Sequence, residues 1–145
     1  MGTRSVIGIQ TGPANFETVY CHWDGYRSHN GRILVEAYQT AEKVFALLNE
    51  GDISSLDVEI GEQHDFNAMR SDLGPWCTFY RRDRGEADAT SKRFTSLKQI
   101  TEYYSWCEFI YIFDVETLTW KCYNPATWRQ LSLKKYQKAA SAKQG

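Results

Sequence analysis

Runs of apolar and β-branched residues along the chain predict strands near both ends of the sequence. Residues 4–10 and 16–24 are two such runs, and the turn-forming stretch T-G-P-A-N between them predicts a β-hairpin with a longer loop. Residues 108–114 (E-F-I-Y-I-F-D) give the strongest strand pattern, and residues 120–123 follow a turn as its partner. Residues 76–81 (W-C-T-F-Y-R) predict one more strand in the middle of the chain.

Apolar residues at helical spacing predict about three helices. The first begins at Arg32, the second follows Thr40 as its N-cap and stops at Gly51, and the third follows Ser96 as its N-cap. Their expected buried faces are Ile33, Leu34, Ala37 and Tyr38 in the first, Ala41, Val44, Phe45 and Leu48 in the second, and Leu97, Ile100, Tyr104 and Cys107 in the third.

The remaining segments show no clear period. Residues 51–74 predict a loop-rich crossing, residues 82–93 a mobile charged loop, and the segment after N-P-A-T a short strand or helix. The resulting order β-β-α-α-β-α-β-β favours an α+β fold over a doubly wound parallel sheet. We therefore expect a single domain over residues 1–138, with a mainly antiparallel sheet, and a frayed tail over residues 139–145.

Composition narrows the class of protein. The chain has 145 residues, which suits one core, and its net charge of -1 gives no global field for nucleic acid or an anionic membrane. We expect no sequence-specific nucleic-acid binding and no membrane span, because no apolar run is long enough. The four cysteines form no C-x-x-C pair, the start lacks a signal-peptide pattern, and Val6 breaks a myristoylation motif. The sequence therefore predicts a cytosolic protein with reduced thiols.

The stretch Y-C-H-W-D-G-Y at 20–26 is the first candidate site. Alternate side chains of a strand point to opposite faces, which predicts one apolar face and one polar, aromatic face that ends at a turn. The expected core face is Val19, Cys21 and Trp23, and the expected polar face is Tyr20, His22 and Asp24. The alternative interpretation is a solvated strand face with a His22–Asp24 ion pair.

A basic cluster is the second candidate. R-R-D-R at 81–84 follows Tyr80, and Lys92 and Arg93 close the same segment, so that guanidinium groups could bind phosphate beside an aromatic ring. A solvated loop with interleaved carboxylates is the alternative. His64-Asp65 is a weaker third candidate. No ligand spacing matches a metal motif, so we expect neither a metal nor a cofactor.

A hydrolase remains open on chemical grounds. His22 would act as acid or base with Asp24 as its orienter, although no nucleophile elbow or P-loop is present. Ser5 and Cys21 are possible nucleophiles by residue type only. We therefore favour a binding protein over an enzyme.

Several motifs together resemble a set of small proteins encoded by bacteriophages. These are T-R-S-V-I-G-I at 3–9, Y-C-H-W-D-G-Y with H-N-G at 29–31, G-D-I-S-S-L at 51–56, and W-C-T-F-Y-R-R-D-R-G-E at 76–86. Arg27 stands where such sequences often have proline. The resemblance implies a phage accessory protein that acts in the host cell cytoplasm, and by analogy one directed against host defences.

With that resemblance, the sequence predicts a protein that sequesters an anionic nucleotide-type immune signal, such as a cyclic nucleotide or an ADP-ribose derivative. The expected ligand-binding residues are Tyr20, His22, Asp24, Tyr26, Asn30, Trp76, Tyr80, Arg81, Arg82 and Arg84. Aromatic rings would stack on the base, Asp24 and Asn30 would bind the ribose, and the arginines would bind phosphate. The alternatives are a protein–protein inhibitor of a host defence complex and a phosphodiesterase-like hydrolase. Aromatic richness suggests a homo-oligomer, although helices on the second sheet face would explain it equally well.

Overall fold

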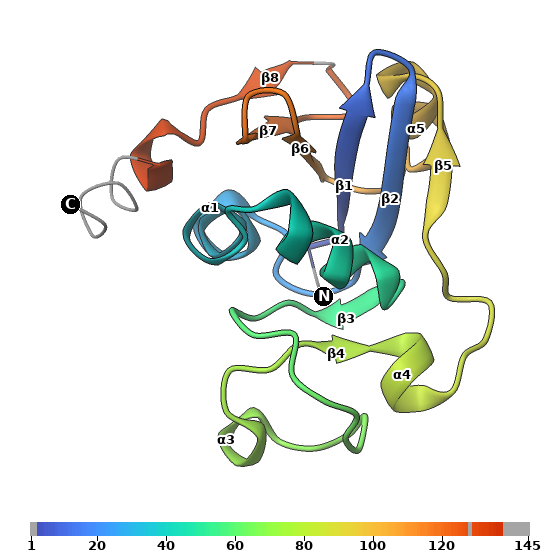
Figure 1. The fold of residues 1–145 in the computed structure, drawn as a ribbon, viewed down its shortest axis with the longest axis vertical. Coiled ribbons are helices and arrows are strands. Elements are labelled where there is room, and N and C mark those ends of the chain that lie inside the picture. The colour runs from blue at the N-terminus through green and yellow to red at the C-terminus, as the bar shows by residue number, and fades with distance from the viewer. Residues whose placement is uncertain (1–2, 128, 138–145) are drawn as a thin grey trace.

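Eight strands form one sheet in a computed structural model, which describes residues 3–127 and 129–137 (Figure 1). The strands are β1 (Ser5–Gly12), β2 (Asn15–Cys21), β3 (Ile53–Ser55), β4 (Thr78–Phe79), β5 (Lys92–Phe94), β6 (Phe109–Asp114), β7 (Thr119–Tyr123) and β8 (Gln130–Leu131). Their order is β4-β3-β2-β1-β6-β7-β8, with β5 also paired to β2. The predicted α+β class is confirmed; the predicted tail lies outside the described residues.

The sheet is mainly antiparallel, as predicted, but two of its pairings are parallel. β1 runs parallel to β6 and β2 parallel to β3, whereas the β1–β2, β2–β5, β3–β4, β6–β7 and β7–β8 pairs are antiparallel. The parallel β1–β6 pair has a consequence for the site. It brings the start of β1, the start of β6 and the end of β2 to the same end of the sheet.

Helices cover both faces of the sheet. α1 (Arg32–Ala37) and α2 (Ala41–Asn49) pack on one face, and α5 (Leu97–Tyr103) contributes Ile100 to a smaller core on the other face. Figure 1 shows α1 and α2 close together and α5 apart from them, next to β2 and β5. Alternation in β6 sends Tyr111 into the first core and Ile110 into the second. The helices therefore account for the two-sided apolar pattern of β6.

The three predicted helices are present as α1, α2 and α5, the last two with their predicted caps, but the described residues form five α-helices rather than about three. The Thr40 hydroxyl oxygen accepts the Lys43 N–H at 3.2 Å, and the Ser96 hydroxyl oxygen accepts the Gln99 N–H at 3.2 Å. The predicted buried face of α2 was wrong at one position. Phe45 is 42% exposed, and Leu47 of the same helix is buried instead. A π-helical turn (Arg27–Gly31) leads into α1.

The middle of the chain differs most from the sequence prediction. The loop expected over 51–74 contains β3 and a short helix, α3 (Arg70–Leu73). The strand expected over 76–81 is only the two residues of β4, because the chain turns into α4 (Tyr80–Arg84), where the Asp83 carboxylate accepts the Phe79 N–H at 2.8 Å. The loop expected over 82–93 begins within α4 and ends in β5, which pairs with β2.

Two smaller differences concern turns and ends. The β1–β2 hairpin is tight rather than long, because Gly12 already pairs with Asn15. The segment predicted as a strand or a helix contains both, β8 followed by a helical turn over residues 134–137. No helix in the described part of the chain is long and apolar enough to cross a membrane.

Candidate functional site

An aromatic cluster forms at the end of the sheet where β2 ends and β1 and β6 begin. It consists of Tyr20, His22, Trp23 and Trp106 with the guanidinium of Arg4. Tyr20 comes from β2, Arg4 immediately precedes β1, and Trp106 lies in the turn between α5 and β6. The Glu108 N–H donates to the Arg4 carbonyl at 2.9 Å, which holds the two chain segments side by side. The strand order is thus what assembles this cluster.

The rings of the aromatic cluster touch one another in series. The centroids of Trp23 and His22 are 4.6 Å apart, and those of Tyr20 and Trp106 are 4.9 Å apart. The Tyr20 hydroxyl is hydrogen-bonded to His22 Nδ1 at 2.6 Å, and the Arg4 Cζ lies 5.9 Å from the Trp106 ring centroid. Trp23 is 43% exposed and Trp106 50% exposed. Two large rings therefore present apolar surface to solvent beside hydrogen-bonding groups and a cation.

Burial sets the protonation of the polar groups in this cluster. Burial raises the pKa of Tyr20 to about 12, with a further rise from Tyr80, so the phenol keeps its proton at neutral pH. Burial also lowers the pKa of His22 below its usual value, and the charge of Arg4 lowers it further. At neutral pH, the cluster therefore offers a neutral phenol, a neutral imidazole and the Arg4 cation. Such a set suits an anionic ligand with a flat ring.

A second group, the α4 cluster, consists of Phe66, Tyr80 and Arg84. The ring centroids of Phe66 and Tyr80 are 5.5 Å apart, and the Arg84 Cζ lies 5.1 Å from the Phe66 centroid and 6.0 Å from that of Tyr80. The Ser54 hydroxyl is hydrogen-bonded to Tyr80, whose pKa is raised by burial. The two clusters adjoin, because Asp52 accepts the backbone N–H of Tyr20 at its carboxylate, at 2.9 Å, and the backbone N–H of Tyr80 at its carbonyl, at 3.2 Å.

The predicted phosphate ligands Arg81 and Arg82 have other partners. Arg82 donates to the carbonyls of Ile60 at 3.0 Å, Gly61 at 3.1 Å and Cys77 at 3.0 Å, and pairs with Asp83 at 3.0 Å. Its side chain is 12% exposed. These carbonyl groups lie outside the strands of the sheet, so the Arg82 guanidinium, rather than a neighbouring strand, supplies their hydrogen-bond donors. Arg81 is exposed and donates to the Asn49 carbonyl at 3.3 Å.

The turn after β2 gives several predicted residues other surroundings than the sequence suggested. β2 ends at Cys21 and Asp24 has a φ of 55°, so the alternation expected over 22–24 is lost and Trp23 is exposed instead of buried. His22 bonds to Tyr20, and the described contacts show no His22–Asp24 pair. Asn30 is fully buried and donates to the Trp23 carbonyl at 3.1 Å. Tyr26 is 40% exposed and contacts the ring of His29.

The remaining candidates lie in buried networks. His64 Nε2 is 3.0 Å from the Thr78 hydroxyl, its Nδ1 is 3.7 Å from the Asp83 carboxylate, and its ring lies 6.1 Å from that of Trp76. The two possible nucleophiles, Ser5 and Cys21, are both fully buried. Burial raises the pKa of Cys21 to about 12, so its thiol is protonated. In the part of the chain that the structure describes, no three His, Cys, Asp or Glu residues could jointly hold a metal ion.

Sequence reasoning missed Arg4, Trp106 and Phe66. Trp106 had a usable signal, since it is absent from the predicted buried face of the helix that precedes it and so points outward. Arg4 had none, because only the parallel pairing of β1 and β6 brings it to Trp106. Phe66 sits in a segment without a period and meets Tyr80 only through the tertiary fold.

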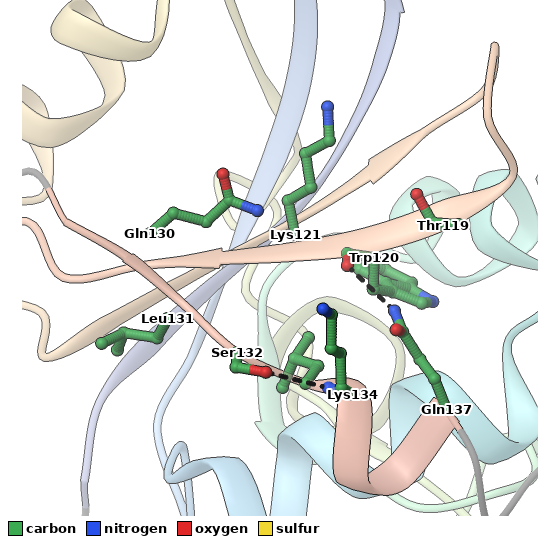
Figure 2. Close-up of a pocket in the computed structure, with 9 residues that line it drawn as sticks. Thr119, Trp120, Lys121, Gln130, Leu131, Ser132, Lys134 and Gln137 are labelled. Atoms are coloured by element: carbon green, nitrogen blue, oxygen red, sulfur yellow. Dashed lines mark hydrogen bonds between the residues drawn. The ribbon is translucent and has the colours of Figure 1, made fainter.

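Cavities in the described part of the chain also lie elsewhere, and three of them are lined by none of the expected ligand-binding residues, although Arg93 of the basic cluster lines the smallest. Figure 2 shows the one of about 360 Å³ between β7, β8 and the helical turn at 134–137, with Lys134 directed toward Trp120. Gln137 donates to the Trp120 carbonyl at 3.5 Å there, and Lys121 is paired with Asp114 at 3.2 Å. Cavities of about 540 and 190 Å³ flank the β1–β2 turn. The predicted residues that remain together are Tyr20 and His22 in one cluster and Tyr80 and Arg84 in the other.

Comparisons with known proteins add no family to this geometry. No protein-family model, no curated protein and no solved structure matches the chain.

Proposed function

We propose that this protein binds a nucleotide-type anion at the aromatic cluster and sequesters it without turnover. One observation carries the proposal: the half-exposed Trp106 ring lies beside the Arg4 cation and the Tyr20 and His22 hydrogen-bonding groups. A base would stack on the indole, Arg4 would bind phosphate, and the phenol and imidazole would bind ribose or base edges. With the sequence resemblance, we further propose that the protein acts as a phage counter-defence protein in the host cytoplasm.

Sequestration without turnover is favoured over hydrolysis by the local chemistry. A hydrolase needs a base held by an orienting group and an accessible nucleophile or activated water. His22 bonds to a phenol rather than to Asp24, and the candidate nucleophiles Ser5 and Cys21 are buried. The site therefore offers binding groups without a recognisable reacting pair.

The first experiment is a thermal-shift panel of mononucleotides, cyclic dinucleotides, ADP-ribose and NAD, with chromatographic recovery of each compound afterwards. A ligand at a hundredfold its Kd should add about 2.7 kcal/mol of stability, which corresponds to a rise of several degrees in Tm. Intact recovery supports sequestration, whereas loss of the compound with time supports the hydrolase. If no nucleotide shifts Tm, the proposal fails.

Two variants locate the site. Trp106→Ala removes the exposed ring and should weaken the ligand by about 1–3 kcal/mol, the usual range for a base stacked on an aromatic side chain. Arg4→Ala removes the cation beside it. Matched controls are Tyr103→Ala, which removes another half-exposed ring, and Lys134→Ala, which removes a cation at the cavity of Figure 2. Equal losses in the test and control variants would contradict the location.

A protein partner is the second candidate function, favoured by the exposure of three large aromatic side chains. Trp23, Trp106 and Tyr103 are 43%, 50% and 50% exposed, and tryptophan and tyrosine are common anchors of interfaces. On this alternative, the protein would inhibit a host defence complex. A purified defence protein would then form a complex with the wild-type chain, Trp106→Ala would abolish it, and no nucleotide would bind. We also propose that these same side chains mediate a homo-oligomer. Light scattering of the purified protein tests that oligomer separately.

A further inference from the structure

Two arginine–aromatic pairs lie on adjoining parts of the surface. In the aromatic cluster, Arg4 lies over the Trp106 ring at 5.9 Å, and in the α4 cluster Arg84 lies over the Phe66 ring at 5.1 Å. Each pair combines a π face with a guanidinium group, which is the combination that binds a base together with a phosphate. The sequence gives no hint of this duplication, since Arg4 and Phe66 were not among its candidates.

Hydrogen-bonding side chains lie between the two pairs. Tyr20 contacts Trp106 and bonds to His22, and Tyr80 contacts Phe66 and bonds to Ser54. Asp52 links the two tyrosines, since it accepts the backbone N–H of Tyr20 at 2.9 Å and that of Tyr80 at 3.2 Å, and burial keeps both phenols protonated at neutral pH. A ligand that reached from one pair to the other would thus cross hydroxyl and imidazole groups that can bond to its sugars.

The carboxylate paired with Arg84 does not prevent anion binding. Arg84 is 3.6 Å from Glu86, and their side chains are 55% and 48% exposed. An ion pair this exposed is weak in water, so a phosphate can compete with Glu86 for the guanidinium. Arg4 is likewise exposed, and its positive charge favours a lower pKa at both Tyr20, where burial outweighs it, and His22. Both cations therefore remain accessible to an anion.

We propose that the aromatic cluster and the α4 cluster are two subsites for one dinucleotide, with one base on Trp106, the other on Phe66, and phosphates at Arg4 and Arg84. This inference rests on the proposed function and specifies the class of ligand as a dinucleotide. A compound with a single base, such as ADP-ribose, would use only one of the two rings. The second base adds a second stacking contact without the full entropic cost of binding a separate molecule.

Binding stoichiometry and affinity test the inference by calorimetry on the full chain, with AMP, ADP-ribose and the linear dinucleotide pApA as probes. We expect two AMP but one pApA per protein, and pApA bound at least about tenfold more tightly than AMP. Trp106→Ala and Phe66→Ala should each weaken pApA by about 5- to 150-fold and reduce the AMP stoichiometry to one. Tyr103→Ala is the control and should leave the AMP stoichiometry, the pApA stoichiometry and the pApA affinity unchanged.

Arg84→Ala provides a second test should Phe66→Ala not fold, since its side chain is more than half exposed. It should weaken pApA while leaving the AMP site at Trp106 intact. One AMP per protein, with pApA no tighter and insensitive to both Phe66→Ala and Arg84→Ala, would overturn the two-subsite inference while the proposed function stands. Absence of binding by every probe would overturn both.

Discussion

Replacing Arg82 with alanine should destabilise the fold strongly, although the sequence suggests a surface arginine available to phosphate. The guanidinium donates to three backbone carbonyls, those of Ile60, Gly61 and Cys77, and pairs with a carboxylate that is itself fully buried, Asp83. Arg82→Ala would leave all four acceptors without this donor.

The expected magnitude follows from the buried partner. Removing one member of a buried ion pair costs about 3–5 kcal/mol, because the remaining charge loses its compensation. Asp83 keeps the backbone N–H groups of His64 at 3.0 Å and Phe79 at 2.8 Å, so the lower part of this range is the better estimate. A loss of about 3 kcal/mol is a large fraction of the stability of a typical domain, about 5–15 kcal/mol.

Urea denaturation measured by tryptophan fluorescence gives the free energy of unfolding for each variant. Arg81→Ala is the matched control, since this neighbour is exposed and makes a single bond to the Asn49 carbonyl; it should cost less than about 0.5 kcal/mol. Arg82→Lys keeps the charge without the planar fork and should lie between the two. Equal, small losses for Arg82→Ala and Arg81→Ala would refute a structural role for Arg82.

Two further predictions concern His22 and Gly61. The pKa of His22, measured by NMR, should lie below 6.5, and Arg4→Ala should move it back upward. Because the folded-state pKa is lowered, the contribution of His22 to stability is present above pH 6.5 and is lost as the pH falls through the folded-state pKa. A midpoint at or above 6.5 would contradict this. Gly61→Ala should destabilise by at least about 1 kcal/mol in the same urea assay, because φ is +72° and a Cβ would lie 2.3 Å from Trp76 Cγ. Gly74→Ala, also at positive φ but with open space around it, should cost less.

Local patterns were sufficient where neighbouring residues decide the structure. The caps at Thr40 and Ser96 were predictable because a hydroxyl oxygen bonds to an N–H three residues away. The strand at 108–114 was predictable because five consecutive β-forming residues, F-I-Y-I-F, leave few alternatives. The same kind of reasoning found Tyr20 and His22 on one polar face, since alternation holds as far as β2 continues.

Local patterns failed where a distant partner decides the structure. Trp23 was expected in the core, but β2 ends at Cys21, the Trp23 N–H donates to the Ser54 carbonyl at 3.0 Å, and the ring is exposed. Arg82 was expected to bind a ligand, but carbonyls about 20 residues earlier in the chain use its donors. The sequence around an arginine does not show whether its guanidinium will bind a ligand or the protein's own carbonyl groups.

The sequence by itself determined the class of fold, most of the strands and helices, and one half of the aromatic cluster. Only the tertiary structure decided which residues complete the candidate site. The parallel pairing of β1 with β6 brings Arg4 to Trp106, and the turn into α4 brings Tyr80 to Phe66. The physical reason is that backbone preference and side-chain period act over a few residues, whereas strand order is set by burying apolar surface throughout the whole chain.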